Sequence, residues 1–297
     1  MSVGKRKKVQ FKLATDILIR IDYSEKIKEQ YDNNKIYFGC PANWIDLAKK
    51  DKEGIADKFE AIFAHVKKGD SRLSIICDDG IPLNMFRGLW EDEKEDGTVF
   101  VRYARHCLIP TTCFFSVAAY QKLKSGKEKL IIDLRKYYKS LGYNQEECSL
   151  LVVKKPQRLF DELKQQIPNS LSKHANIRFD DEYDDKKCLL AKRVKYNLDI
   201  NKEFCDLDGL RKLTDIYRKR KKYRPQREAR LIIPKVYFTA DPVFRKDAYE
   251  VNRLSVDLPN LKEYCIYGDA KDVNYLVFDD YNEETDTIRI RFSKEPE

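Results

Sequence analysis

The sequence predicts an α+β protein, because apolar segments of strand length and segments with helical spacing occur in the same chain. Aromatic residues make up 12% of the 297 residues, and disordered chains lack such an aromatic content. Only 11 glycines and 10 prolines are present, which argues against long flexible joints. We therefore expect a folded protein with a substantial core.

The strands and helices follow from local patterns of apolar residues. Strands are expected at residues 17–21, 36–38, 98–103, 112–118, 149–153, 189–198, 226–233, 274–278 and 287–292. Helices are expected at 24–31, with Ser24 as N-cap, at 57–66, and from 207 through a basic run to Arg224. In the last of these, apolar residues recur every three or four positions, and Pro225 stops the helix.

No internal repeat and no low-complexity linker divides the chain. Its length is sufficient for one large domain. We expect a single α+β domain over residues 1–297, with an inserted middle region at about 126–201.

The charge balance favours anionic partners. The chain carries 58 Lys and Arg against 49 Asp and Glu, a net charge of +9. Such a surface suits nucleic acid, nucleotides, phospholipid or an acidic protein, although solubility alone explains it equally well.

The location is predicted to be cytoplasmic. No apolar run reaches the length of a transmembrane span or follows the basic N-terminus as a signal peptide would. No membrane partner is therefore expected. The eight cysteines contain no C-x-x-C pair and several lie in apolar runs, so we expect reduced, buried thiols.

The segment after Pro225 is the first candidate site. On a strand, Gln226, Glu228 and Arg230 share one face, while the alternate residues from Ala229 to Ile233 point toward a core. An amide, a carboxylate and a guanidinium together can form a polar site in which Glu228 holds a sugar hydroxyl. The alternative is a solvated edge strand, and a second Gln-x-Glu triplet at 145–147 shows how weak the motif is by itself.

An aromatic block near the N-terminus is the second candidate. Tyr37, Phe38 and Trp44 offer flat surfaces on which a ring can stack, and Asn43 offers a polar contact. The alternative is an ordinary strand and turn with core aromatics.

The basic run between residues 218 and 224 is a candidate nucleic-acid contact. It is interleaved with tyrosines, and charge and stacking together guide single strands. The alternative is that cations favour a helix C-terminus. The expected contacts are Arg218, Arg220, Lys221, Lys222 and Arg224.

No metal site is expected. The three histidines lie far apart in the sequence, and the acidic segment 180–185 lacks the spacing and glycine of an EF-hand loop. A metal-dependent nuclease using that acidic segment is therefore the weakest functional hypothesis.

Taken together, these segments resemble the ADP-ribosyltransferase superfamily. The resemblance rests on the order of Arg20 on the first strand, Ser116 at the end of a later strand, and the Gln226-Arg-Glu228 strand. The chain also resembles a poorly characterised bacterial group with N-D-P-F-E early and E-x-E-W-R late, found near toxin and phage-defence genes. The matching segments here are Asp57-Lys-Phe-Glu60 and the stretch 223–233.

The departures from these patterns are specific. Ala56 stands in place of Asn and Lys58 in place of Pro, while Gln226 replaces the first Glu and Ala229 replaces Trp. The Ser-Thr-Ser motif of the superfamily is reduced to its last residue, Ser116.

The resemblance implies a split, bent β core that binds NAD as substrate and no metal. Glu228 would bind the ribose hydroxyl and stabilise the ribosyl cation, and Gln226 would orient the acceptor. Arg20 would pair with a phosphate and Ser116 would support Glu228. The aromatic block, Tyr37, Phe38 and Trp44 with Asn43 beside them, would hold nicotinamide or adenine.

The resemblance further implies a toxin or anti-phage effector that modifies RNA, DNA or protein and is restrained by an antitoxin or chaperone. The leading alternative is a non-catalytic, basic nucleic-acid-binding protein, followed by the nuclease.

Overall fold

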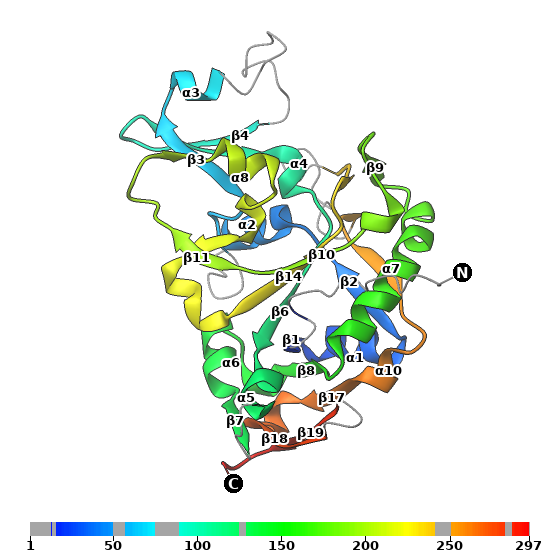
Figure 1. Ribbon diagram of the computed structural model, residues 1–297. Helices are drawn as coiled ribbons and strands as arrows, with labels where there is room; N and C mark the ends of the chain where they lie inside the picture. Colours follow the sequence, from blue (N-terminus) through cyan, green and yellow to red (C-terminus); the bar gives the residue numbers. More distant parts are fainter. Residues whose placement is uncertain are drawn as a thin grey trace, which may run out of the picture.

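The computed structural model describes residues 13, 16–49, 57–74, 89–124, 129–240, 251–282 and 287–296. It is a mixed α/β protein with a core of β-sheet and several helices around it, in agreement with the predicted α+β class (Figure 1). No helix in these described ranges is long and apolar enough to cross a membrane.

A six-stranded sheet forms the centre of the molecule. Its neighbouring strands are all antiparallel. The order is β10 (Leu190–Arg193), β14 (Glu228–Ile232), β6 (Thr111–Val117), β1 (Ile17–Tyr23), β8 (Cys148–Val153) and β17 (Cys265–Asp269).

Alternation along the strands of this sheet divides its side chains between two cores. On β1, Leu18 belongs to one apolar cluster, whereas Ile17, Ile19 and Ile21 belong to the other. The first cluster includes α7 (Pro156–Ser172), whose apolar residues recur every three or four positions, and the pair β2 (Lys35–Phe38) and β16 (Leu254–Asp257). The second includes α6 (Arg135–Leu141) and the three-stranded sheet β19 (Thr287–Ser293), β18 (Tyr275–Asn282) and β7 (Leu130–Asp133). Both faces of the central sheet are therefore covered.

A smaller sheet lies beyond one end of the central sheet, near the top of Figure 1. Its order is β12 (Phe204–Cys205), β3 (Ile62–Lys67), β5 (Thr98–Tyr103) and β4 (Leu89–Glu93). Two further pairs are β11 (Lys195–Leu198) with β13 (Arg218–Arg220), and β15 (Val236–Phe238) with β9 (Ile177–Phe179).

Short helices connect these strands. The α-helices not yet named are α1 (Ser24–Asp32), α2 (Pro41–Lys49), α3 (Ser71–Ser74), α4 (Ala104–Cys107), α5 (Ala119–Lys124), α8 (Leu207–Arg211) and α10 (Leu261–Tyr264). The 3-10 helices are η2 (Gln145–Glu147), η3 (Asp185–Lys187), η4 (Asp215–Tyr217), η5 (Lys221–Gln226) and η6 (Ala270–Asp272).

Strands occur at each predicted position, but the predicted strand 189–198 is two strands, β10 and β11, and the one predicted at 226–233 begins only at Glu228. Two predicted helices are wrong. The segment 57–66 forms a turn, closed by Ala61 at φ 54°, and then strand β3. Residues 62–66 are buried on both faces of that strand, so no period-2 alternation distinguishes it from a helix in the sequence.

The long helix predicted from 207 to 224 is also wrong. It ends at Arg211, and Leu213 takes a left-handed conformation at φ 57°. Its apolar residues serve two different cores, since Leu207 and Leu210 pack on the smaller sheet whereas Leu213 packs with Ile216 elsewhere. One straight helix cannot reach both.

Two smaller expectations also change. Ser24 does not cap its helix, because Tyr23 is the N-cap and the Ser24 hydroxyl accepts a hydrogen bond from Ser149. The middle region 126–201, expected as an insertion, supplies β8 and β10 to the central sheet. That residues 126–201 form a separate insertion in the domain stays a prediction.

Candidate functional site

Three neighbouring strands of the central sheet carry the residues on which the resemblance rests. Glu228 begins β14 and lies opposite Phe115 of β6, while Ser116 of β6 lies opposite Leu18 of β1. Arg20 follows two positions along β1. The sheet thus brings together segments that are far apart in the sequence.

Gln226 lies at the site, but not on the strand on which it was predicted. It ends the 3-10 helix η5, and Arg227 then takes a left-handed conformation at φ 44° before β14 begins. Gln226 is therefore not on the strand, and period-2 alternation does not apply to it. Its side chain nevertheless lies beside Glu228, because Lys219 hydrogen-bonds to both.

A cavity of about 200 Å³ lies where these elements meet. Its lining combines strands β1, β2 and β6 with the start of α2 and the turn into β14. Six of the eight residues predicted to bind NAD or to act in catalysis line it: Arg20, Tyr37, Asn43, Trp44, Gln226 and Glu228.

Arg20 and Tyr37 form one wall of this cavity. Nη1 of Arg20 donates to the Tyr37 carbonyl at 3.1 Å and to Oγ1 of Thr112 at 2.7 Å. The Tyr37 ring packs against the guanidinium of Arg253, 3.6 Å from the ring centroid. Burial and the hydrogen bond that its hydroxyl donates to Glu29 raise the pKa of Tyr37 to about 12.

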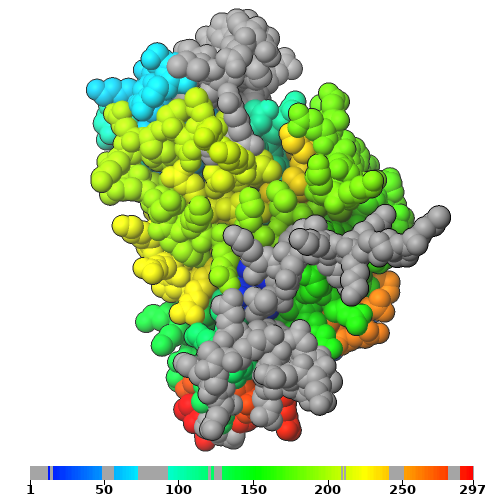
Figure 2. All heavy atoms as spheres, viewed as in Figure 1, coloured from blue at the N-terminus to red at the C-terminus, as the bar shows by residue number. Residues whose placement is uncertain are grey.

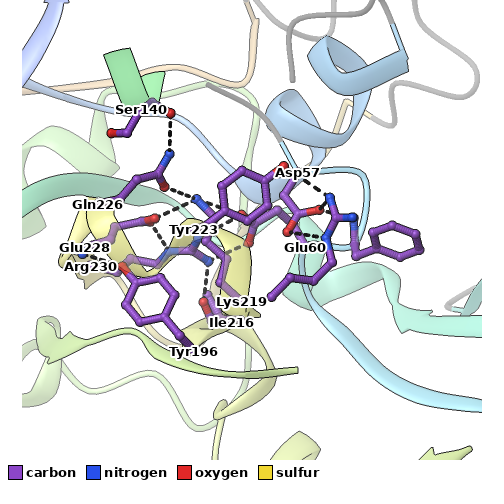
Figure 3. A network of polar contacts seen from close by, with 12 residues as sticks. Asp57, Glu60, Ser140, Tyr196, Ile216, Lys219, Tyr223, Gln226, Glu228 and Arg230 are labelled. Atoms are coloured by element: carbon purple, nitrogen blue, oxygen red, sulfur yellow. Dashed lines mark hydrogen bonds and ion pairs between the residues drawn. The ribbon is translucent and has the colours of Figure 1, made fainter. Parts of the chain in front are cut away.

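Another part of the lining belongs to a buried network of two cations and two carboxylates (Figure 3). Nε of Arg230 donates to Oε1 of Glu228 at 2.5 Å, and Nζ of Lys219 donates to Oε2 of Glu228 at 2.7 Å. The same Arg230 binds both oxygens of Glu60, at 2.8 and 2.9 Å. Lys219 also lies 3.4 Å from Glu60 and donates to Oε1 of Gln226 at 3.1 Å.

Backbone groups fix this network further. The Ile216 carbonyl accepts a hydrogen bond from Nη1 of Arg230. The Glu228 amide donates to the Tyr196 hydroxyl at 2.6 Å, and Nε2 of Gln226 donates to the Ser140 carbonyl at 3.3 Å. Trp44 packs against Arg230, with the guanidinium 5.0 Å from the ring centroid. The side chains of the network are therefore fixed by several hydrogen bonds, ion pairs and ring contacts.

The network keeps Glu228 ionised. Burial opposes its charge, but Arg230 and Lys219 outweigh burial and hold the pKa of Glu228 well below its ordinary value of 4.5. Burial raises the pKa of Glu60, against the attraction of the same two cations. Because Glu228 lines the cavity and Glu60 does not, the permanent negative charge faces the cavity.

This lowered pKa predicts how stability depends on pH. A carboxylate whose folded pKa is depressed stabilises the fold above its unfolded pKa and loses that contribution as pH falls through the folded value. We expect the difference in unfolding free energy between the wild type and Glu228→Gln to be constant at neutral pH and to shrink below about pH 4.5. Urea denaturation at a series of pH values measures it. A difference that stays unchanged down to about pH 3 would contradict the assignment.

Two predicted site residues lie outside the cavity. Phe38 is fully buried in the first apolar cluster, because strand alternation turns it away from Tyr37. The Ser116 hydroxyl donates to the buried carboxylate of Asp16, which also binds Arg193. No hydrogen bond from Ser116 to Glu228 occurs among the described residues, so Ser116 does not contact the carboxylate that it was expected to support.

The basic run divides into an inner and an outer part. Arg218 pairs with Asp206 at 2.8 Å, and Arg220 pairs with Asp57 at 2.7 Å. Lys221, Lys222 and Arg224 lie exposed on η5. Only this outer part is open to solvent.

Lys219 is a site residue that the sequence pattern does not single out. It lies within a run of cations typical of a surface, yet its side chain is only 5% exposed. The signal is strand alternation: if 218–220 is a strand, Lys219 points opposite to Arg218 and Arg220. The wrongly predicted helix concealed it.

The two segments that carry the bacterial resemblance meet in this site. Asp57 and Glu60 come from the early segment, whereas Glu228 and Arg230 come from the late one. Ion pairs join the segments through Arg230 to Glu60 and through Arg220 to Asp57.

The remaining candidates lie elsewhere. The acidic segment 180–185 forms a turn and the start of η3, and its Asp180 contacts Arg105 at 3.5 Å. Within the described ranges, no cluster of three or more His, Cys, Asp or Glu side chains has the arrangement of a metal site. His106 forms a buried pair with Asp215 at 2.7 Å, away from the cavity lining.

Comparison with known proteins returns no relative. No family model matches the chain, and neither the curated proteins nor the solved structures contain a match.

Proposed function

We propose that this protein transfers the ADP-ribosyl group of NAD to an acceptor, with Glu228 as the carboxylate that stabilises the ribosyl cation. The observation that carries the proposal is the cavity. It joins an ionised, buried carboxylate, an arginine and two aromatic rings, Tyr37 and Trp44, from segments that are distant in the sequence.

The charge of the cavity suits a dinucleotide. Ion pairs with acidic side chains offset four of the five lining cations, whereas Arg20, among the described residues, donates only to neutral oxygens and keeps its charge for the pyrophosphate of NAD. The lining cations are Arg20, Lys26, Lys219, Arg230 and Arg253. A volume of about 200 Å³ is below the roughly 300–1,000 Å³ of whole-ligand pockets. We therefore assign the cavity to the nicotinamide riboside half and the rim to the remainder.

Glu228 retains capacity for a substrate hydroxyl. A carboxylate has about four acceptor positions, and Lys219 and Arg230 occupy one on each oxygen. A free position can accept a hydrogen bond from the ribose hydroxyl. The fixed negative charge then lies beside the sugar carbon as positive charge develops on it, which lowers the barrier.

The reaction exchanges one glycosidic bond for another. The bond between the ribose anomeric carbon and the nicotinamide nitrogen breaks, and nicotinamide leaves with the electron pair. The acceptor forms the new bond to the anomeric carbon and releases its proton to solvent. Gln226, held by Lys219 and the Ser140 carbonyl, lies beside Glu228 to orient that acceptor.

The arrangement of the sheets supports an ADP-ribosyltransferase-like core. The strands of Glu228, Ser116 and Arg20 are adjacent in the central sheet. Glu60, just before β3 of the smaller sheet, binds Arg230 of the central sheet. A buried ion pair thus links two sheets at the cavity, as expected of a split β core.

The direct test uses NAD labelled separately on nicotinamide and on the adenylate group, with RNA, DNA and protein mixtures as acceptors. We expect release of labelled nicotinamide, and adenylate label in one acceptor class. If no nicotinamide is released with any acceptor and NAD does not bind in calorimetry, the proposal is wrong.

Arg20→Lys is expected to weaken NAD binding roughly tenfold. Lysine keeps the charge but cannot form the paired hydrogen bonds of a guanidinium with phosphate. Calorimetry with NAD measures the loss, and Arg158→Lys, at an exposed position of α7, is the matched control. Equal NAD affinity of the two variants would show that Arg20 does not bind NAD.

A further inference from the structure

A cationic surface borders the cavity on the side of Gln226. It comprises α6, η5 and β11, three elements that contain no Asp or Glu. Leaving aside Arg135, which pairs with Asp133, and Lys222, the exposed cations of these elements and of Arg227 next to η5 are Lys136, Lys139, Lys195, Lys221, Arg224 and Arg227. We call these six residues the basic surface.

The three elements are contiguous in space. The helix η5 packs against both α6 and β11, and Gln226 of η5 donates to the Ser140 carbonyl of α6. The Arg227 charge acts on the Tyr137 hydroxyl of α6, whose pKa burial raises and Arg227 lowers. Figure 2 shows the yellow atoms of this part of the chain between the yellow-green and green segments on one face.

The cations of the basic surface are available to a partner. Within the part of the chain that the structure describes, none of the six pairs with an acidic side chain. This distinguishes them from Arg218 and Arg220, whose charges Asp206 and Asp57 neutralise. Among the described residues, the six cations therefore give this surface a net positive charge.

The basic surface also adjoins the cavity. Leu141, which ends α6, and Gln226, which ends η5, both line the cavity. A ligand bound along these elements consequently reaches the opening beside Glu228.

The composition of the surface favours nucleic acid over protein. A protein interface needs an apolar or aromatic centre, but Tyr137, Tyr138 and Tyr223 are buried and Tyr196 is half-buried. A membrane-binding surface needs apolar side chains that insert, and Pro225 is the one exposed apolar residue in these three described elements. A surface that consists mainly of cations is typical of contact with a phosphate backbone.

The position of Glu228 favours a single strand. Glu228 is 7% exposed and is reached through the cavity, so a base or ribose stacked within a duplex cannot approach it. An unpaired nucleotide can enter while the strand follows the cations outside.

We propose that the basic surface binds single-stranded nucleic acid and presents an unpaired nucleotide to the cavity as the ADP-ribose acceptor. The acceptor role depends on the proposed function, whereas the binding of the strand does not. The two statements can therefore fail separately.

The test measures binding of labelled single-stranded RNA and DNA, about 20 nucleotides long, across a range of salt concentrations. The variant Lys136→Gln/Lys221→Gln/Arg224→Gln removes three charges of the basic surface. The control Lys67→Gln/Lys173→Gln/Lys271→Gln removes three exposed charges elsewhere.

Each lost phosphate contact lowers the slope of log affinity against log salt by about 0.7 for a single strand. We expect the basic-surface variant to lose about 2 in slope and roughly 50-fold in affinity at 0.15 M salt. The control should bind as the wild type does. With NAD present, the variant should keep nicotinamide release, with water as the acceptor, but lose transfer of label to the oligonucleotide.

Three results would overturn the proposal: no binding by the wild type, equal binding by the two triple variants, or tighter binding to polyglutamate or phosphatidylserine vesicles than to the oligonucleotides. Nicotinamide release without added oligonucleotide, with water taking the ADP-ribosyl group, reports on the proposed function alone. No release with any acceptor and no NAD binding, together with intact, salt-dependent binding of the strand, would reject the enzyme and leave the binding surface standing.

Discussion

Glu228→Gln is expected to lower nicotinamide release from NAD by about 10²- to 10³-fold, because it removes the negative charge that faces the developing ribosyl cation. Glutamine has the same shape and still offers an oxygen to Lys219 or Arg230. NAD affinity should change much less than the rate, since the charge matters most in the transition state. Steady-state rates and calorimetry with the same protein separate the two effects.

The chain provides its own control for this variant. Glu147 ends the second Gln-x-Glu triplet, on the exposed 3-10 helix η2. Glu147→Gln makes the same chemical change away from the cavity and should retain wild-type turnover. If Glu228→Gln is folded by circular dichroism and also retains full turnover, Glu228 is not the catalytic carboxylate.

Arg230→Met is expected to destabilise the fold by about 3–5 kcal/mol, because removal of one member of a buried ion network leaves its partners without compensation. Arg230 is fully buried and holds both Glu60 and Glu228. Methionine fills similar space but donates no hydrogen bond. Lys219 alone would then face two buried carboxylates. Urea denaturation at neutral pH measures the loss.

A double variant tests the stated cause. Glu60→Gln introduced into Arg230→Met removes one uncompensated charge, so part of the lost stability should return. The control is Arg72→Met, which breaks the surface pair with Asp70 and should cost far less, since exposed pairs contribute little. Equal losses in Arg230→Met and Arg72→Met would mean that the buried network does not stabilise the fold.

Local pattern predicted β1, β6, β8 and β14 of the central sheet, whereas β10 was predicted only as part of a longer strand and β17 was not predicted. The alternation that sends Ala229 and Leu231 into the first core, and Glu228 toward the cavity, depends only on neighbouring residues along one strand. The same holds for β1 and β6, whose apolar residues identified them. These strands could be predicted because burial of at least one face requires apolar residues at regular positions in the sequence.

Local pattern failed where one segment serves two environments. The residues from 207 to 217 match a helix, but their apolar side chains pack in separate cores, so the chain breaks at Leu213. Strand β3 is buried on both faces and shows no alternation. In both cases tertiary contacts overrode the local preference.

For the site, the sequence by itself determined the residue types and the strand that carries Glu228. Only the tertiary structure decided that Lys219 points inward and donates hydrogen bonds to Glu228 and Gln226. It also placed Phe38 and Ser116 outside the cavity. Finally, it paired Arg218 and Arg220 with acidic side chains while the cations of η5 stay exposed. The physical reason is that a buried charge needs a partner. Here those partners, Glu60 and Asp57, come from more than 150 residues away in the sequence, where no local pattern can indicate them.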